Sequence, residues 1–224
     1  MTKELSEYWS QLDGPVHPAD MSNFELFPDH GFNLDFPPPA FIGDVINAPI
    51  VILDNNGGYD ASLTPAEFPD RDAHDEFRDM LANPRPVSRD ERMLSPYYLA
   101  RNYSQWLVDG VATLVNGVAY RSVDGKAKHV TRMTKSLPSA LFHQHWLHEV
   151  LRPQAERGER FVIVHRWSRW NGAADALRVC RNAIFSSAPV SKDLTAREIE
   201  AGELFLAARE LAGGRAVKVG YCRN

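Results

Sequence analysis

The stretch IVILDNNGGYD, residues 50–60, places four apolar residues directly before a polar segment that contains two glycines. The run APIVIL, residues 48–53, is short, apolar and β-branched, which is typical of a strand buried on both faces. The following asparagines, glycines and aspartates predict a loop, since glycine lets the backbone approach a ligand closely or take a positive φ. We therefore expect a central strand that ends in a ligand-facing loop.

Three further segments have strand character, at residues 111–120, 160–165 and 182–187. Helical patterns lie between and after these strands, at residues 72–82, 95–109, 139–157, 169–180 and 195–212, the last with Gly213–Gly214 as its stop. Strands that alternate with helices are typical of a parallel sheet covered on both faces. The sequence therefore predicts an α/β fold, a three-layer α/β/α arrangement with a central four-stranded, mainly parallel sheet.

The first 40 residues differ from the rest, because they are rich in proline and aromatic side chains. Tyr8 and Trp9 indicate one short helix, and the remainder predicts an extended arm. Its phenylalanines indicate that the arm packs on a body: Phe24, Phe27, Phe32 and Phe36. We expect residues 1–40 to form this packed arm and residues 41–224 to form a single α/β domain.

Composition restricts the class of protein. The two cysteines, Cys180 and Cys222, form no CxxC pair and no metal or cluster spacing, which indicates a reducing compartment. The first 15 residues have no apolar core, and no run approaches the roughly 18 apolar residues of a membrane span. We expect a cytoplasmic protein without a membrane partner, a metal or another cofactor.

The net charge of −4 conceals an asymmetry along the chain. Residues 1–100 hold 6 Lys/Arg against 18 Asp/Glu, and residues 101–224 hold 19 against 11. The run at 121–135 is especially basic, with Arg121, Lys126, Lys128, Arg132 and Lys135 against Asp124. A track for phosphate groups and an ordinary solvated loop both remain open interpretations of this run.

Ligands of open parallel sheets bind outside the carboxyl ends of the strands. Each predicted strand is followed there by polar residues: Asn116 with Tyr120-Arg121-Ser122, then residues 165–170, then residues 186–195. Four such strand ends favour a binding site at one edge of the sheet. Arg169 and Trp170 are the candidates at the third strand end for contact with an aromatic ligand.

In their order, these segments resemble the uracil-DNA glycosylase superfamily. In that family the first strand runs into Gly-Gln-Asp-Pro-Tyr or Gly-Leu-Asn-Pro-Gly, and here it runs into Asp54-Asn55-Asn56-Gly57-Gly58-Tyr59. Asn56 stands at the water-positioning residue and Gly57 at the proline. The family's Leu-Leu-Asn has its counterpart in Leu114-Val115-Asn116, and its His-Pro-Ser-Pro-Leu-Ser in residues 186–191, with Pro189 and Ser191 identical and Ser186 at the histidine.

The chain also looks like a divergent, less characterised bacterial branch with this fold. The segments that carry this likeness are Phe41-Ile42-Gly43-Asp44, the NNGGY run, Ala119-Tyr120-Arg121-Ser122, Leu137-Pro138-Ser139 and VIVHRWSRW. Together the two likenesses cover about residues 40–205, and the order of the motifs carries more weight than any one of them.

The resemblance implies a protein that flips a nucleotide out of single- or double-stranded DNA and hydrolyses the N-glycosidic bond of a damaged base. It implies that Asn56 positions the water, with Ser186 in the second catalytic position. Tyr59 would form a wall of the pocket, and Asn116 would hydrogen-bond the edge of the base. Tyr97 or Tyr98 would stack on the base. The other binding residues that it implies are Asn55, Gly57, Gly58, Arg121, Ser122, Arg166, Pro189, Val190 and Ser191.

Three alternatives remain open. The same fold without catalysis would be a module that binds nucleic acid or a nucleobase. The run HQHWLHE (143–149) offers three histidines and a glutamate, but it lacks the HExxH zinc spacing, and a helix face packed on the sheet explains it better. Asp54 directly after the first strand is also the position of a phosphatase nucleophile, although such enzymes have a second acid where Asn56 stands.

Overall fold

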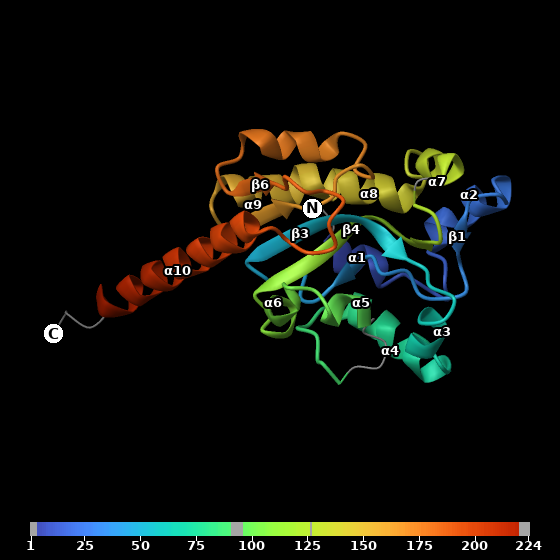
Figure 1. Ribbon diagram of the computed structural model, residues 1–224, viewed down its shortest axis with the longest axis horizontal. Coiled ribbons are helices and arrows are strands. Elements are labelled where there is room, and N and C mark those ends of the chain that lie inside the picture. Colours follow the sequence, from blue (N-terminus) through green and yellow to red (C-terminus); the bar gives the residue numbers. More distant parts are fainter. Residues whose placement is uncertain (1–3, 91–95, 126, 220–224) are drawn as a thin grey trace.

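The computed structural model describes residues 4–90, 96–125 and 127–219. The chain is an α/β protein whose mixed sheet has six strands and is flanked by helices (Figure 1). The strand order is β1-β4-β3-β5-β6, and β2 pairs with β4 beside β1. The strand predicted from residues 48–53 thus lies inside the sheet, with neighbours on both sides.

The four predicted strands are present as β3 (Ile50–Gly58), β4 (Ala112–Ser122), β5 (Phe161–Val164) and β6 (Ala183–Phe185). The pairs β3–β4, β3–β5 and β5–β6 are all parallel. The predicted number of four strands is wrong, because β1 (Phe32–Asn33) and β2 (Phe41–Ile42) pair antiparallel with β4. Two-residue strands are too short to show a period-2 pattern in the sequence.

The predicted loop after residue 53 is wrong. β3 continues through DNNGG, and its pairing with β4 places Asp54 opposite Asn116, with an irregularity between Asn56 and Gly58. Neither Gly57 nor Gly58 has a positive φ. A Cβ atom at Gly57 would lie 2.5 Å from Cγ of Pro39, so this glycine is required by the close approach of a proline ring rather than by a turn.

The helices before β4 are α1 (Leu5–Trp9), the 3₁₀ turn η1 (Pro18–Asp20), α2 (Met21–Leu26), α3 (Thr64–Glu67), α4 (Arg71–Ala82), α5 (Pro96–Leu99) and α6 (Ser104–Val108). Those after β4 are α7 (Lys128–Met133), α8 (Pro138–Trp146), the π-helical turn η2 (Leu147–Leu151), α9 (Arg152–Glu156), the 3₁₀ helix η3 (Ala173–Val179) and α10 (Ala196–Val219).

The predicted helices at 72–82 and 139–157 are confirmed, the second as the continuous run α8-η2-α9. The predicted helix at 95–109 is two short helices with a turn between them, and its first residue, Ser95, lies outside the described residues. The helix expected at 169–180 is a 3₁₀ segment. The predicted stop at Gly213–Gly214 is wrong, since α10 continues to Val219 and projects from the body (Figure 1).

The arm contains helices as well as extended chain, so its predicted extended form is wrong in part. Trp9 on α1 is fully buried, and its indole nitrogen donates to Nε2 of His143 on α8 over 2.8 Å. Asp20 is also fully buried, and its carboxylate accepts from the Tyr120 hydroxyl over 2.6 Å and from the Ser139 backbone N–H over 2.9 Å. We call Trp9, His17, Asp20, Tyr120 and His143 the arm cluster.

The arm cluster also fixes the tautomer of its central histidine. An indole N–H can only donate, so Nε2 of His143 accepts from Trp9 and Nδ1 carries the proton. That proton is donated to the backbone oxygen of Asn116, 2.7 Å away. Burial lowers the pKa of His143 to about 4, which keeps the ring neutral. His143 is therefore a structural link between the arm, α8 and β4.

Two findings bear on the expected partners. Within the described parts of the chain, no three His, Cys, Asp or Glu side chains are grouped so that they could hold a metal ion. None of the described helices is both long enough and apolar enough to cross a membrane.

Candidate functional site

A cavity of about 430 Å³ lies at the carboxyl ends of β3 and β4, and we call it the pocket. Its volume lies within the range of small-molecule sites. Eight of the predicted site residues line it: Asn56, Gly58, Tyr59, Tyr97, Asn116, Arg121, Ser122 and Arg166. It also contains several residues that were not predicted as site residues: Asp54, Asp60, Leu63, Thr64, Glu67, Val123, Gly125 and Lys192. Tyr98, the alternative stacking residue, lines it too.

A second hollow of about 660 Å³ adjoins the pocket, and we call it the groove. The two share Asn56, Val123, Gly125 and Arg166. Three other predicted residues line the groove: Asn55, Pro189 and Val190. The remaining three, Gly57, Ser186 and Ser191, line neither hollow.

The alternation of side chains along β3 explains which of its residues enter the pocket. Residues two apart on a strand face the same side, so Asp54 and Asn56 both line the pocket. The Asn55 side chain does not line the pocket; it lines the groove and accepts from the Arg169 backbone N–H over 3.1 Å. Because β3 continues where a loop was predicted, the Asp54 carboxyl and the Asn56 amide lie side by side.

Asp54 has the features of an acid–base group. It is 4% exposed, and its Oδ1 accepts from the Asn55 backbone N–H over 2.7 Å and lies 3.6 Å from Nε of Arg166. Burial raises the pKa of Asp54, and the charge of Arg166 opposes that rise. A buried carboxyl with a raised pKa that also lines a cavity is a candidate catalytic group.

Asn56 is held in one orientation. Its Nδ2 donates to Oγ of Ser122 over 2.8 Å and to the backbone oxygen of Gly57 over 2.9 Å. Because a backbone oxygen only accepts, the NH₂ group must lie on this side of the amide. Oδ1 has no partner among the residues that the structure describes, so it remains available to accept a hydrogen bond from a water or a ligand.

Asn116 is less free than the prediction of a base-reading residue requires. It is 1% exposed, and its Nδ2 donates to the backbone oxygen of Pro39 over 2.6 Å. It lies beside the phenol of Tyr98, whose pKa burial raises. Asn116 therefore joins the arm to the pocket wall, and one of the two N–H donors of its amide is already used.

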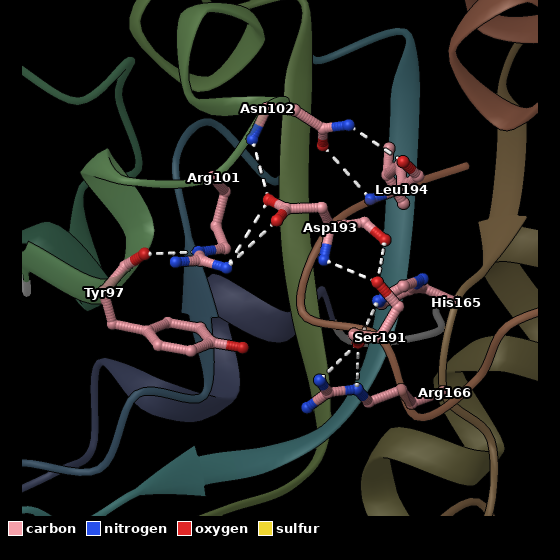
Figure 2. A network of polar contacts seen from close by, with 8 residues as sticks. All are labelled: Tyr97, Arg101, Asn102, His165, Arg166, Ser191, Asp193 and Leu194. Carbon is pink, nitrogen blue, oxygen red and sulfur yellow. Dashed lines mark hydrogen bonds and ion pairs between the residues drawn. The ribbon is translucent and has the colours of Figure 1, made fainter. Parts of the chain in front are cut away.

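Arg166 connects the pocket to the loop of residues 186–195 (Figure 2). Its Nε and Nη2 donate to the backbone oxygen of Ser191, over 3.2 and 2.5 Å. The Ser191 hydroxyl donates to the Asp193 backbone oxygen over 2.8 Å. The predicted residue Ser191 thus contributes a backbone oxygen that orients Arg166, while its side chain shapes the loop.

The same loop is tied to the segment that carries Tyr97 (Figure 2). The Asn102 side chain donates to the Leu194 backbone oxygen over 2.8 Å and accepts from the Leu194 backbone N–H over 3.1 Å. The Asp193 carboxylate accepts from the Asn102 backbone N–H over 3.0 Å and lies 3.4 Å from Nη1 of Arg101. These bonds hold Lys192 and the Tyr97 segment on the same side of the pocket.

Tyr97, one of the two predicted stacking residues, lines the pocket with its aromatic ring. Its ring lies edge-on to Tyr98, with the centroids 5.4 Å apart, and the Arg101 guanidinium lies 4.7 Å from its centroid. Burial raises the pKa of Tyr97, while the nearby charge of Arg166 lowers it. The phenol is therefore neutral at ordinary pH, and its ring forms part of the pocket lining.

Arg121 forms part of the pocket floor rather than an exposed phosphate contact. Its Nη2 lies 3.5 Å from Oε2 of Glu67 on α3, and both side chains are 4% exposed. Burial lowers the pKa of Arg121, and the Glu67 carboxylate opposes that change. The basic run at 121–135 is thus divided, because Arg121 is buried and Lys128 and Arg132 lie on α7; Lys126 lies outside the described residues.

The structure does not bring Ser186 to the pocket. Ser186 is 6% exposed, its backbone N–H donates to Val164, and its Oγ accepts from the Ala188 backbone N–H over 3.1 Å. The side chain caps a turn, so it cannot serve as the second catalytic group that the alignment of motifs implied. Val190, in contrast, is 88% exposed at the rim of the groove.

Trp170 is a packing residue, which corrects its candidacy as a contact for an aromatic ligand. It is fully buried, its Nε1 donates to the Asp54 backbone oxygen over 2.9 Å, and its ring fills the space beside Gly117. Arg169 lines the groove, but it is 7% exposed and its Nη1 donates to Oγ1 of Thr131 over 2.7 Å.

The sequence points to Asp54 only as the alternative phosphatase nucleophile, and it does not reveal Glu67 or Lys192 as pocket residues. An aspartate directly after four buried apolar residues was the available signal for Asp54, because it predicts a carboxyl near the sheet edge. Glu67 and Lys192 line the pocket because of tertiary contacts made by α3 and by the 186–195 loop. No local sequence pattern predicts such contacts.

Comparison with known proteins returned no match, whether to a family model, to a curated protein or to a solved structure.

Proposed function

We propose that the chain is a uracil-DNA glycosylase-like protein that hydrolyses the N-glycosidic bond of a damaged base in DNA. One observation carries the proposal: Asp54 and Asn56 lie side by side on one face of β3, in a pocket at the carboxyl edge of parallel strands. The parallel order β4-β3-β5-β6 supports it, because ligands of such sheets bind where the strand order reverses.

The geometry supports a hydrolytic step. A water that donates to Oδ1 of Asn56 and to the Asp54 carboxylate would be held beside the pocket floor. Its oxygen attacks C1′ of the sugar, the C1′–N bond breaks, and the bonding electron pair leaves with the base. Asp54 takes the water proton as general base.

Three cations line the pocket, Arg121, Arg166 and Lys192, and of these Arg121 is paired with Glu67. Arg166 and Lys192 would provide the positive charge that a base leaving as an anion requires, and no histidine among the described residues lines the pocket. Tyr97 and Tyr59 provide aromatic surfaces that can stack on the extruded base.

A second candidate is a non-catalytic module that binds nucleic acid or a nucleobase in the same pocket. The position of Ser186 favours it, since the hydroxyl caps a turn and lines neither hollow. This candidate keeps the stacking and hydrogen-bonding roles of the pocket but involves no bond cleavage.

Base release tests both candidates. Single- and double-stranded oligonucleotides that carry uracil, hypoxanthine, xanthine or an oxidised pyrimidine would be incubated with the protein and then cleaved at abasic sites by alkali. We expect cleavage with wild type and a loss of about a hundredfold or more in Asp54→Asn and Asn56→Ala. Asp60→Asn is the matched control, since this exposed carboxylate at the pocket rim is bound to Ser62.

Equal rates in Asp54→Asn and wild type would contradict the assigned site. Binding that falls steeply with salt, without any base release, would favour the non-catalytic module. Absence of both binding and release would reject a nucleic-acid substrate.

A further inference from the structure

The groove is continuous with the pocket and has a different character. Arg166 and Asn56 lie at the boundary, since they line both hollows. Beyond this boundary the groove is lined by Trp167, Pro189 and Val190, and Val123 lies on its pocket side. Val123 and Val190 are 74% and 88% exposed, so the mouth of the groove is apolar and open to solvent.

Trp167 presents aromatic surface to this groove. Its ring meets Phe185 edge-on with centroids 5.7 Å apart, and the Arg178 guanidinium lies 4.0 Å from the Phe185 centroid. The indole is half-buried, whereas Trp9, Trp146 and Trp170 are at most 1% exposed. Trp167 therefore has a supported position together with a surface on which a planar ring can stack.

The charges of the groove suit a phosphate between two planar groups. Arg166 lies at the boundary and Arg169 lies on the wall, where burial lowers the pKa of Arg169 and the charge of Asp124 opposes that change. In a nucleic-acid strand one phosphate separates neighbouring nucleosides. A nucleotide in the pocket would thus place its phosphate near Arg166 and its neighbouring base near Trp167.

We propose that the groove is a subsite for the nucleobase adjacent to the one in the pocket, with Trp167 as its stacking surface. This inference rests on the proposed function and deepens it, because it makes the substrate a strand of at least two nucleotides rather than a free nucleoside. The adjacent base is recognised by its flat face, so the subsite tolerates any base identity.

A cycle of protein and ligand changes tests the subsite. Five-nucleotide single strands carry a central uracil or hypoxanthine, with a 2′-fluorine that slows glycosidic cleavage, and an end label for anisotropy. In matched strands both bases next to the centre are replaced by abasic units. Each strand is titrated against wild type, Trp167→Ala, Trp167→Phe and the control Trp106→Phe, whose half-buried indole lies against Gly202 on α10.

We expect the abasic neighbours to weaken binding to wild type and to Trp106→Phe about tenfold. They should not weaken binding to Trp167→Ala further, because that variant lacks the stacking surface. Trp167→Phe retains a ring and should retain most of the dependence, whereas Trp167→Leu, titrated in the same way, keeps apolar volume without a flat ring and should lose it. The test therefore also holds if the alanine variant does not fold.

Two results would overturn the subsite while leaving the proposed function intact. The first is a wild type that binds both kinds of strand equally. The second is an equal loss from abasic neighbours in wild type and in the Trp167 variants that lack a ring, which would place the neighbouring base elsewhere. A wild type that binds no strand at all would reject the proposed function, and the subsite with it.

Discussion

The arm cluster and the pocket both bury polar groups beside β4, but they satisfy them differently. In the arm cluster the Asp20 carboxylate, the Tyr120 hydroxyl and both nitrogens of His143 all have protein partners. In the pocket, Oδ1 of Asn56 and Oδ2 of Asp54 have no hydrogen-bond partner among the described residues. Buried polar groups are almost always satisfied. The first region therefore stabilises the fold, and the second keeps bonding capacity for a ligand.

The largest expected effect is in the arm cluster. Asp20→Ala removes a buried acceptor of two hydrogen bonds, one from the Tyr120 hydroxyl and one from the Ser139 backbone N–H. Since hydrogen bonds to charged groups are strong and their donors would be left buried, the free energy of unfolding should fall by roughly 4 kcal/mol. Urea denaturation measures this loss. The control Asp35→Ala, at an exposed residue of the same arm, should change it by less than about 1 kcal/mol.

His143 predicts a pH dependence of stability. Burial holds its pKa at about 4 in the folded state, below the ordinary histidine value of 6.5. The unfolded chain binds the proton first as the pH falls, so this contribution is complete above pH 6.5 and is lost as the pH falls towards 4. Its size is roughly 3 kcal/mol. Urea unfolding of wild type and His143→Gln at several pH values should show a slope in this window that the variant lacks, and parallel curves would refute the neutral buried ring.

Gly57 lies where the two regions meet, beneath Pro39 of the arm. A Cβ atom there would lie 2.5 Å from the proline ring, whereas a Cβ atom at Gly58 has nothing within 4 Å. Gly57→Ala should therefore destabilise the protein by about 2 kcal/mol through overpacking. Gly58→Ala is the matched control and should change stability by less than about 0.5 kcal/mol. Equal midpoints of thermal unfolding for the two variants would show that Pro39 of the arm does not pack closely against Gly57 of β3.

The smallest expected effect on stability is at Asp54. Burial raises its pKa in the folded state. The stability that the protonated carboxyl contributes is therefore lost as the pH rises from about 4 through that raised pKa. Asp54→Asn lacks this loss. Its free energy of unfolding should thus improve relative to wild type as the pH rises, to a difference of about 1 kcal/mol near neutrality. Chemical denaturation at several pH values measures the trend, and a difference of opposite sign would show that Arg166 outweighs burial.

Much of the fold was predictable because it depends on local patterns. The buried apolar runs gave β3 to β5, and the N-cap Asp70, whose carboxylate accepts from the Ala73 backbone N–H, agrees with the predicted start of α4. The two-residue strands β1 and β2 were not predictable, since their pairing with β4 is a long-range contact.

The candidate site was predictable in position but not in all its roles. The strand ends led to the pocket, and Asn56 and Tyr97 do line it. The role of Asn116 depends on where Pro39 returns to the sheet, and the role of Ser186 depends on the turn that it caps. Neither of these contacts can be predicted from sequence spacing, so motif order alone could not show that the Asn116 amide is bound to Pro39 or that Ser186 lies outside the pocket.

The most direct test of the division between the two regions measures base release and unfolding free energy on the same preparations of Asp54→Asn and His143→Gln. We expect Asp54→Asn to unfold like wild type at neutral pH, within about 1 kcal/mol, yet to release no base from the oligonucleotide that wild type processes. His143→Gln should be less stable and, at a temperature where it is folded, should release base at close to the wild-type rate. Wild-type release by Asp54→Asn would contradict this division, because the pocket carboxyl would then have no part in the chemistry.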